Sequence, residues 1–354
     1  MPVSQPIPCL PLPAIADDDD DFVLHEGQVP ATAAAQMECL YGSLYASLPQ
    51  LQLSGLAGAG TYIAGHPALP SAIFLYRHDG RALRVINEGM HISASDAERF
   101  ASRMFRRLPA LRSVHWHAIR MDDAHWPEAP PSLPVSRFDC SEDIVLDLPA
   151  NEADYLHALG KATRKSLRQR LARAKGLCHS VLVGPASAHP ALIASIIAFN
   201  HARLANKARL SALGASSAGK LQWLMRERGL AGLVHIDGKL CGGTLACRIA
   251  DDVYSLVNAH DPAHDKLGLG NLCRHLMILH AIRTGARRFH LLGGNYASKR
   301  ACLAQRITLQ HVVLHRDRWQ RLLDWRAQLG WRLAQAELRV RRRIDDARHG
   351  ISHG

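Results

Sequence analysis

The sequence predicts an α+β fold with a mainly antiparallel sheet, and three features support this prediction. Apolar residues make up 47% of the 354 residues, which is enough to form buried cores in two domains. The second half contains short apolar segments separated by tight turns such as Asp237-Gly238, as expected of antiparallel hairpins. A helical segment over 272–284 ends at Gly285 and interrupts these strands, so one helix connects two strands in the middle of the sheet.

The first half is preceded by a segment that is not expected to fold. Residues 1–21 are rich in proline and end in five aspartates, whose mutual repulsion predicts a disordered tail. Residues 22–150 form the first α/β half, in which Ser95 and Glu98 have the spacing of a capping box for a helix over 95–107. The other expected elements are a helix over 31–48, strands over 71–76, 83–86, 114–120 and 144–148, and a proline-rich linker over 127–134.

Residues 151–315 form the second predicted domain. Its pattern begins with a long helical stretch over 152–175 and continues with alternating strands and helices. The expected strands cover 177–183, 230–236, 240–249, 253–258, 289–292 and 307–315, and the expected helices cover 189–206, 217–228 and 272–284.

Residues 316–354 are predicted to form an amphipathic C-terminal helix, which begins at Trp319. One apolar stripe follows helical spacing and contains Trp319, Leu322, Leu323, Leu329, Leu333, Ala336, Val340 and Ile344. We expect this stripe to dock on the protein's own core. Because the helix is also rich in arginine and tryptophan, peripheral contact with an anionic bilayer is a second interpretation.

Composition restricts the environment and the partners. The formal net charge of +12 favours anionic partners, namely a phosphorylated cofactor, nucleic acid or an anionic membrane. The eight scattered cysteines contain no C-x-x-C pair, and neither a signal peptide nor an apolar run of membrane-spanning length is visible, so a cytoplasmic protein is expected. His115 and His117 would share one face of a strand, but without tighter ligand spacing we expect no metal.

The loop over 265–271 is the strongest candidate for phosphate binding. Gly268 and Gly270 allow backbone N–H groups to approach a phosphate at the start of a helix, and Lys266 adds a positive charge. A dinucleotide fingerprint is incomplete because Cys273 stands at the third glycine position. Two glycines are equally compatible with a plain turn.

The segment from Asn258 to Lys299 resembles the BioF2-like or CelD-like acetyltransferases, a branch of the GNAT superfamily related to the FemAB aminoacyltransferases. The similarity rests on a strand ending in His260-Asp261, the Gly268-Leu269-Gly270 loop, a long helix, a strand, and a glycine-rich segment with a tyrosine and a lysine. Upstream, Leu148-Pro149 and the T-R-x-x-x-R pattern at 163–168 also match, so the resemblance covers about residues 140–315. In the family the tyrosine and lysine are adjacent, whereas two residues separate them here.

The resemblance implies a GNAT fold, built as two GNAT-like halves, that uses acetyl-CoA or another acyl-CoA as cosubstrate. It implies acyl transfer to a small-molecule amine, such as an amino sugar or amino acid in polysaccharide or envelope biosynthesis. The residues expected to bind the cosubstrate are Lys266, Leu267, Gly268, Leu269, Gly270 and Asn271. The residues expected to take part in catalysis are His260, Asp261, Tyr296 and Lys299, with His260 as the base that Asp261 orients.

A basic helical stretch over 161–175 supplies candidate substrate ligands. Arg164 and Arg168 share one face, and the arginine fork suits phosphate groups, although a charged face is also what solvent exposure alone would produce. Asn295, in the glycine-rich segment, is the third expected substrate-binding residue.

Three functions are therefore compatible with the sequence. The first is an acyl-CoA-dependent N-acyltransferase, and the second is a FemAB-like aminoacyltransferase that uses charged tRNA. The third is a non-enzymatic basic protein that binds nucleic acid or a membrane surface, although no nucleic-acid-binding module is recognisable. The first interpretation explains most of the features above.

Overall fold

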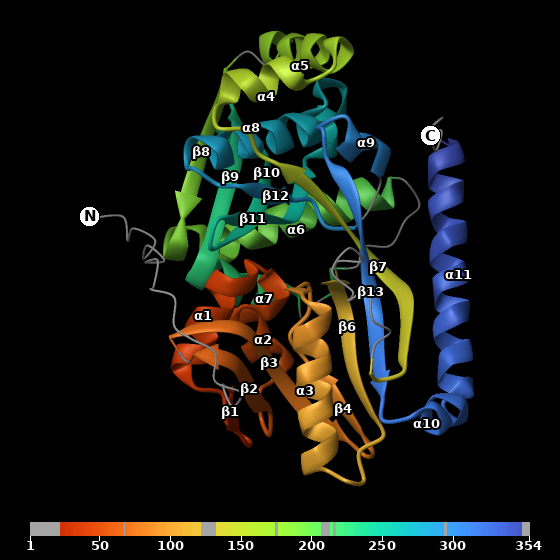
Figure 1. Cartoon of the computed structure of the whole chain (residues 1–354). Helices are drawn as coiled ribbons and strands as arrows, with labels where there is room; N and C mark the ends of the chain where they lie inside the picture. The colour runs from red at the N-terminus through yellow and green to blue at the C-terminus, as the bar shows by residue number, and fades with distance from the viewer. Residues whose placement is uncertain are drawn as a thin grey trace. The chain divides into compact units, whose positions relative to one another are not determined.

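The computed structural model describes residues 22–348, except 67, 122–131, 174–175, 207–212, 215–216 and 294–295. The predicted tail over 1–21, most of the proline-rich linker and Asn295 lie outside the described residues. Two compact units divide the chain: one contains the residues up to Ser141 together with Thr308–Arg348, and the other contains Glu142–Ile307. The predicted domains 22–150, 151–315 and 316–354 stay a prediction. Two strands, β7 (Val135–Asp147) and β13 (Gln305–His315), run from one unit into the other (Figure 1).

Unit 1 contains a twisted sheet in the order β1-β2-β3-β4-β6-β13, with β5 paired to the far end of β6. Its strands are β1 (Phe22–His25), β2 (Gly60–His66), β3 (Leu69–Asp79), β4 (Ala82–Val85), β5 (His91–Ile92) and β6 (Ser113–Met121). Its helices are α1 (Ala31–Tyr41), η1 (Leu44–Ala46), α2 (Leu48–Ser54), α3 (Ala94–Arg107), α10 (Arg318–Leu323) and α11 (Trp325–Arg348). Neighbouring strands are antiparallel except that β6 is parallel to both β4 and β5.

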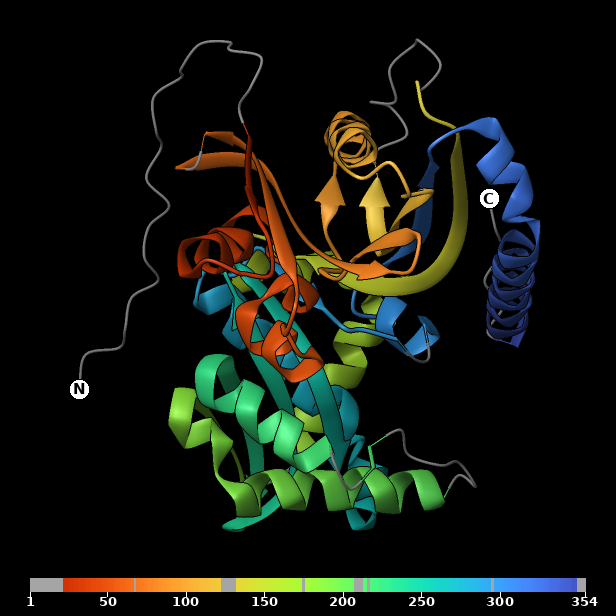
Figure 2. The ribbon, with the colours of Figure 1, turned by 90° about the horizontal axis from the view of Figure 1, so that it is seen from below.

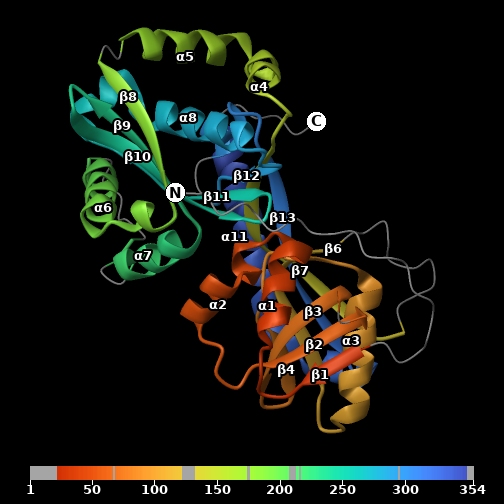
Figure 3. The same cartoon turned by 90° about the vertical axis from the view of Figure 1, so that its left-hand side faces the viewer.

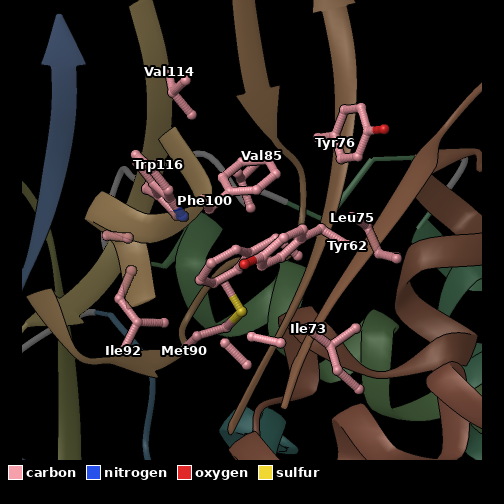
Figure 4. Close-up of a cluster of buried hydrophobic side chains, with 14 of the residues drawn as sticks. Tyr62, Ile73, Leu75, Tyr76, Val85, Met90, Ile92, Phe100, Val114 and Trp116 are labelled. Atoms are coloured by element: carbon pink, nitrogen blue, oxygen red, sulfur yellow. The ribbon is translucent and has the colours of Figure 1, made fainter. Parts of the chain in front are cut away.

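An aromatic cluster forms the core of unit 1. Phe100 of α3 packs against Tyr62 with ring centroids 4.8 Å apart and against Trp116 at 5.9 Å (Figure 4). All three rings are fully buried, so they supply much of the apolar area that holds α3 on the sheet.

The sheet strands of unit 2 follow the order β7-β12-β11-β10-β9-β8. Its further strands are β8 (Leu177–Val183), β9 (Gly229–Ile236), β10 (Lys239–Ile249), β11 (Asp252–His260) and β12 (Arg288–His290). Its helices are α4 (Glu152–Ala158), α5 (Lys161–Arg173), η3 (Gly184–Ala188), α6 (Pro190–Ala205), α7 (Ser217–Arg228), η4 (Pro262–Leu267), α8 (Leu269–Arg283) and α9 (Tyr296–Arg300). Helices α6 and α7 cover one face of the sheet, α8 covers the other, and α5 lies across α8 (Figure 3).

The two units repeat one connection, which confirms the predicted fold with two GNAT-like halves. In unit 2, β11 leads through α8 to β12, and these two strands are parallel although their other neighbours are antiparallel. In unit 1, β4 leads through α3 to β6 with the same parallel pairing. A helix that connects adjacent parallel strands within a mainly antiparallel sheet is thus present twice.

Several predicted element boundaries were wrong. Ser93, not Ser95, caps α3: its Oγ accepts from the Asp96 N–H at 3.0 Å, and Glu98 instead accepts from the Ser132 N–H at 2.6 Å. The helix expected over 31–48 ends before Gly42, whose φ of 56° is left-handed. The stretch over 152–175 breaks at Leu159-Gly160 into two helices.

The C-terminal helix also differs from the prediction. It breaks at Asp324 into α10 and α11, and the predicted apolar stripe is exposed rather than docked. The side of α11 that packs on unit 1 contains Trp331, whose ring lies 4.5 Å from that of His311. Among the described residues, no helix has both the length and the apolar character needed to cross a bilayer.

Candidate functional site

The strands β11 and β12 diverge at the centre of unit 2. They pair only from Asp252–Arg288 to Tyr254–His290, and in this register β12 provides no partner for the six following residues of β11. A bulge at Leu256 contributes to the divergence, because Ala246 pairs with Ser255 whereas Leu245 pairs with Val257. Beyond β12 the chain follows β7 instead, since Leu291 N donates to Ile144 O at 2.7 Å. Among the described residues, no strand pairs with β11 over 255–260 on the side of β12, and we call this the open edge of β11.

The loop after β11 ends in the first turn of α8. Gly268 precedes this helix with a left-handed φ of 64°, a conformation that favours glycine. Leu269, the first residue of α8, is fully buried, so its side chain anchors the start of the helix in the core. N–H groups in a first helical turn have no partner within the helix and carry partial positive charge. Asn271 N and Leu272 N already donate to the Gly268 carbonyl at 3.2 and 3.3 Å, so the predicted loop offers the N–H groups of Leu269 and Gly270 as donors, with the exposed side chain of Lys266 beside them.

Arg170 of α5 holds this loop from the side. Its Nη1 donates to the Gly268 carbonyl at 2.8 Å, and its Nε donates to Ser166 Oγ at 3.0 Å. A Cβ atom on Gly268 would overlap the guanidinium group, so glycine is required by space as well as by φ. These bonds place a permanent positive charge next to the first turn of α8.

His260, the last residue of β11, is buried and paired with a carboxylate. Its Nε2 lies 2.7 Å from Asp265 Oδ1, and its Nδ1 has no hydrogen-bond partner among the described residues. A Cβ atom on Gly270 would lie 3.0 Å from that Nδ1, so the imidazole faces the second residue of α8. The carboxylate that orients His260 is therefore that of Asp265. Asp261, predicted for this role, instead caps η4 by accepting from Ala263 N at 3.0 Å.

A pocket of about 270 Å³ adjoins the loop, between α5, α8 and α9. The lining mixes polar and apolar side chains, and Arg170 is its charged member. The lining residues are Ala162, Thr163, Ser166, Leu167, Arg170, Asn271, His275, Ser298, Ala301 and Cys302. Five of these residues come from α5, and those at positions 163, 166, 167 and 170 follow helical spacing, so one side of α5 forms this wall.

Two buried residues of the lining, His275 and Cys302, contact each other, and Tyr155 contacts His275 from outside the lining. The hydroxyl of Tyr155 lies 3.0 Å from His275 Nδ1, and Cys302 Sγ lies 3.8 Å from His275 Nε2. Burial, followed by the charge of Arg274, lowers the pKa of His275 to about 4, and burial raises the pKa of the Cys302 thiol. The imidazole and the thiol are thus both neutral near pH 7, which does not favour a thiolate nucleophile.

Lys299 and Tyr296 lie on α9, after β12. The Nζ of Lys299 donates to the carbonyls of Leu291, Leu292 and Gly293 at 2.6, 2.6 and 2.7 Å. Burial, followed by the charge of Arg274, lowers the pKa of Lys299 to about 8, so the ammonium form still predominates at neutral pH and supplies three donors. The ring of Tyr296 lies under the guanidinium of Arg306, 4.2 Å from its Cζ.

The structure brings only part of the predicted set together. The loop over 266–271 and His260 are adjacent, whereas Arg164 donates to the His157 carbonyl at 2.8 Å and Arg168 is exposed, and neither lines the pocket. Asn295 lies outside the described residues. Sequence reasoning missed Arg170, Asp265 and His275. The spacing of Thr163, Ser166 and Arg170 on one face of α5 was the available signal for Arg170.

The matching position in unit 1 is filled by protein. Asn87, just beyond β4, is fully buried; its Nδ2 donates to Ile73 O at 2.8 Å, and its Oδ1 accepts from Leu75 N at 3.0 Å. Strand β5 pairs with the far end of β6, the strand that corresponds to β12 of unit 2. In unit 1 the position beyond β4 is therefore taken by the buried Asn87 and its bonds to the backbone of β3.

The histidines His115 and His117 were the candidates for metal binding, and the sequence predicts no metal there. His115 and His117 do lie on one face, each with its ring 5.7 Å from that of His311. Within the described ranges, no group of three or more His, Cys, Asp or Glu side chains is arranged to hold a metal ion.

Comparison with known proteins identifies the domain. A family model described as an acetyltransferase (GNAT) domain matches residues 161–300. No match was found among curated proteins. The solved structure of FemX is similar over 81% of this chain and 96% of its own, with 9% identity and a TM-score of 0.58, which shows a shared fold. The C-terminal domain (DUF2156) of a putative lysylphosphatidylglycerol synthetase from Agrobacterium fabrum has 14% identity over 68% of this chain and 80% of its own, with a TM-score of 0.44. Residues 161–300 thus form a GNAT acetyltransferase domain, and the chain is an acyltransferase with the GNAT fold.

Proposed function

We propose that this enzyme transfers an acyl group from acetyl-CoA or another acyl-CoA to the amine of a small molecule. The observation that carries the proposal is the open edge of β11 beside the first turn of α8. An extended chain with amide groups, such as the pantetheine arm of CoA, can bond to an open strand edge as a further strand would. The pyrophosphate at its end would then meet the N–H groups of α8, flanked by Arg170 and Lys266.

The reaction requires removal of a proton from the attacking ammonium group. The amine nitrogen bonds to the thioester carbonyl carbon, the C–S bond breaks, and the CoA thiolate leaves and is protonated. We assign proton removal to His260, directly or through a water molecule, with Asp265 as the residue that positions the imidazole. Protonation of the thiolate by Tyr296 and catalytic roles for Asp261 and Lys299 stay predictions, and so do the substrate-binding roles of Arg164, Arg168 and Asn295.

An assay of thiol release tests this function. The full chain is mixed with acetyl-CoA or longer acyl-CoAs and a panel of amino sugars and amino acids, and free CoA is measured. Turnover with one donor–acceptor pair is the expected result. If no thioester is consumed and none raises the melting temperature, the proposal is wrong, since a ligand that binds the folded state must stabilise it.

Aminoacyl transfer from charged tRNA is the second candidate. The FemX fold is consistent with it, and the exposed basic side of α5, with Lys161, Lys165 and Arg168, suits a polyanion. Stabilisation by tRNA together with indifference to every thioester would favour this candidate over the first. The BioF2-like subgroup, the place in polysaccharide or envelope biosynthesis and the cytoplasmic location likewise remain proposals that the acceptor panel and localisation experiments can test.

A further inference from the structure

The helices α10 and α11 have two different sides. The side that packs on unit 1 contains Gln328, Trp331, Leu338, Arg342 and Asp346, which recur at spacings of three, four and seven residues. On this side, Trp331 contacts Phe138 at 5.4 Å between ring centroids, and Arg342 Nη2 donates to Thr308 Oγ1 at 3.2 Å. Aromatic and polar contacts together therefore hold α11 on the rest of unit 1.

The other side is apolar and exposed. On α11 it contains Trp325, Leu329, Leu333, Val340 and Ile344, which lie within about 100° of one another on the helical wheel. The exposed fractions of these side chains are 57%, 49%, 63%, 54% and 47%, and α10 adds Trp319 at 75%, Leu322 at 64% and Leu323 at 62%. We call these eight residues the apolar stripe. The two helices that carry it, α10 and α11, follow β13 at the end of the chain (Figure 1, Figure 2).

Arginines border the apolar stripe on both sides. At 100° per residue, Arg332, Arg339 and Arg343 follow one edge, and Arg326 and Arg341 follow the other. All five are exposed. Arg341 pairs with Glu337 at 2.6 Å and Arg339 lies 3.8 Å from Asp139, so the net positive charge beside the apolar surface of α11 comes mainly from Arg326, Arg332 and Arg343.

The chemistry of this surface selects one kind of partner. A second copy of the chain would bring rows of arginine against rows of arginine, and the like charges would oppose pairing. A nucleic acid would satisfy the arginines but offers no apolar layer for leucine, valine and isoleucine. An anionic lipid bilayer satisfies both, because hydrocarbon accepts the stripe and acidic headgroups accept the arginines, while tryptophan favours the boundary between them.

We propose that α10 and α11 dock on an anionic bilayer and lie in the plane of its surface. The stripe enters the boundary between headgroups and acyl chains, and the flanking arginines remain among the phosphates. The proposal is independent of the acyl-transfer reaction, since no residue of the stripe belongs to the site in unit 2.

Vesicle co-sedimentation of the full chain tests the proposal. We expect binding to phosphatidylcholine vesicles that contain about 30% phosphatidylglycerol, and at least tenfold weaker binding to phosphatidylcholine alone. Leu333→Glu with Val340→Glu should weaken binding more than tenfold without lowering the melting temperature, since both positions are exposed. Leu69→Glu, at a leucine that is 55% exposed on β3, is the matched control and should bind like the parent chain.

The contribution of charge has its own variant. Arg332→Gln with Arg343→Gln should weaken binding to the anionic vesicles by about fivefold for each arginine removed, and added salt should weaken the parent chain more than this variant. The proposal is overturned if anionic vesicles do not bind, or if the glutamate variants bind as well as the parent. It is also overturned if those variants lower the melting temperature or convert a dimer to a monomer, because the stripe is then covered by protein.

Discussion

Arg170 Nη1 lies 2.8 Å from the carbonyl oxygen of Gly268, and this bond joins α5 to the turn that begins α8. The arginine fills the space that a side chain at position 268 would occupy. The left-handed turn at Gly268 and the position of Arg170 therefore depend on each other. A change to either residue should disturb the backbone donors of α8.

Gly268→Ala should weaken acetyl-CoA binding by at least tenfold. The new methyl group collides with the guanidinium of Arg170 and strains a residue at φ 64°, so the first turn of α8 must shift. Isothermal titration calorimetry measures the Kd. Gly219→Ala is the control, since a Cβ there meets nothing within 4 Å. An unchanged Kd for Gly268→Ala would remove the loop from the cosubstrate site.

Arg170→Met should weaken binding far more than Arg168→Met. Both substitutions remove one charge from α5, but only Arg170 contacts Gly268 and lines the pocket, whereas Arg168 is exposed. Loss of a charge-assisted contact predicts roughly a 10- to 100-fold increase in Kd for acetyl-CoA. Equal effects of the two variants would mean that the general field of the basic helix, rather than this contact, attracts the ligand.

Asp265→Asn should lower kcat more than Asp261→Asn. The amide cannot hold the imidazole of His260 as a carboxylate does, so proton removal slows by on the order of tenfold, while KM for the acyl-CoA changes little. Asp261 contacts the Ala263 N–H, and asparagine can accept that bond equally well. Steady-state kinetics with saturating acyl-CoA separate the two; a larger loss in Asp261→Asn would restore the role predicted from sequence.

Much of unit 2 could be predicted because its signals are local. The hairpin at Asp237-Gly238, the boundaries of α7 and the glycine that ends α8 each depend on a few neighbouring residues. The partners of the site could not be predicted in the same way. Asp265 replaces Asp261 beside His260 because a short 3₁₀ turn brings position 265 back under the strand end, and Arg170 reaches Gly268 across 98 positions of sequence. The exposed apolar stripe was placed in the core because periodicity identifies an apolar side but not what covers it.

Lys299→Met should destabilise the fold by about 3 kcal/mol. The ammonium group binds three carbonyls around Leu292, a residue with a φ of 53°, and methionine leaves these buried acceptors without their donor. Urea unfolding followed by circular dichroism measures the loss, and Lys266→Met, at an exposed lysine, is the control. A variant that keeps its stability but loses turnover would instead support the catalytic role predicted for Lys299.

Acidification should destabilise the chain through two histidines of unit 1. Burial, followed by repulsion from neighbouring histidines, lowers the pKa of His311 to about 4 and that of His115 to about 3. Above pH 6.5 each is neutral in both the folded and the unfolded chain, and its contribution to stability is complete. As the pH falls from 6.5 toward 4, the unfolded chain binds protons that the folded chain does not, so stability falls by up to about 1.4 kcal/mol per pH unit for each histidine.

His117 affects stability in the alkaline range. Hydrogen bonds to Cys140 and Glu88 raise its pKa to about 10, so its contribution to stability is lost as the pH rises from 6.5 toward 10.

His311→Phe should reduce the acid-side loss. Both ring nitrogens of His311 lack a hydrogen-bond partner among the described residues, so phenylalanine removes the titration and keeps the contact with Trp331. Urea unfolding at half-unit steps from pH 7.5 to 4.5 should show a shallower decline than in the parent chain, with higher stability at pH 5. His78→Gln, at an exposed histidine of the same unit, should leave the decline unchanged. If the stability of His311→Phe follows the parent curve at every pH, proton binding at position 311 does not contribute to acid unfolding.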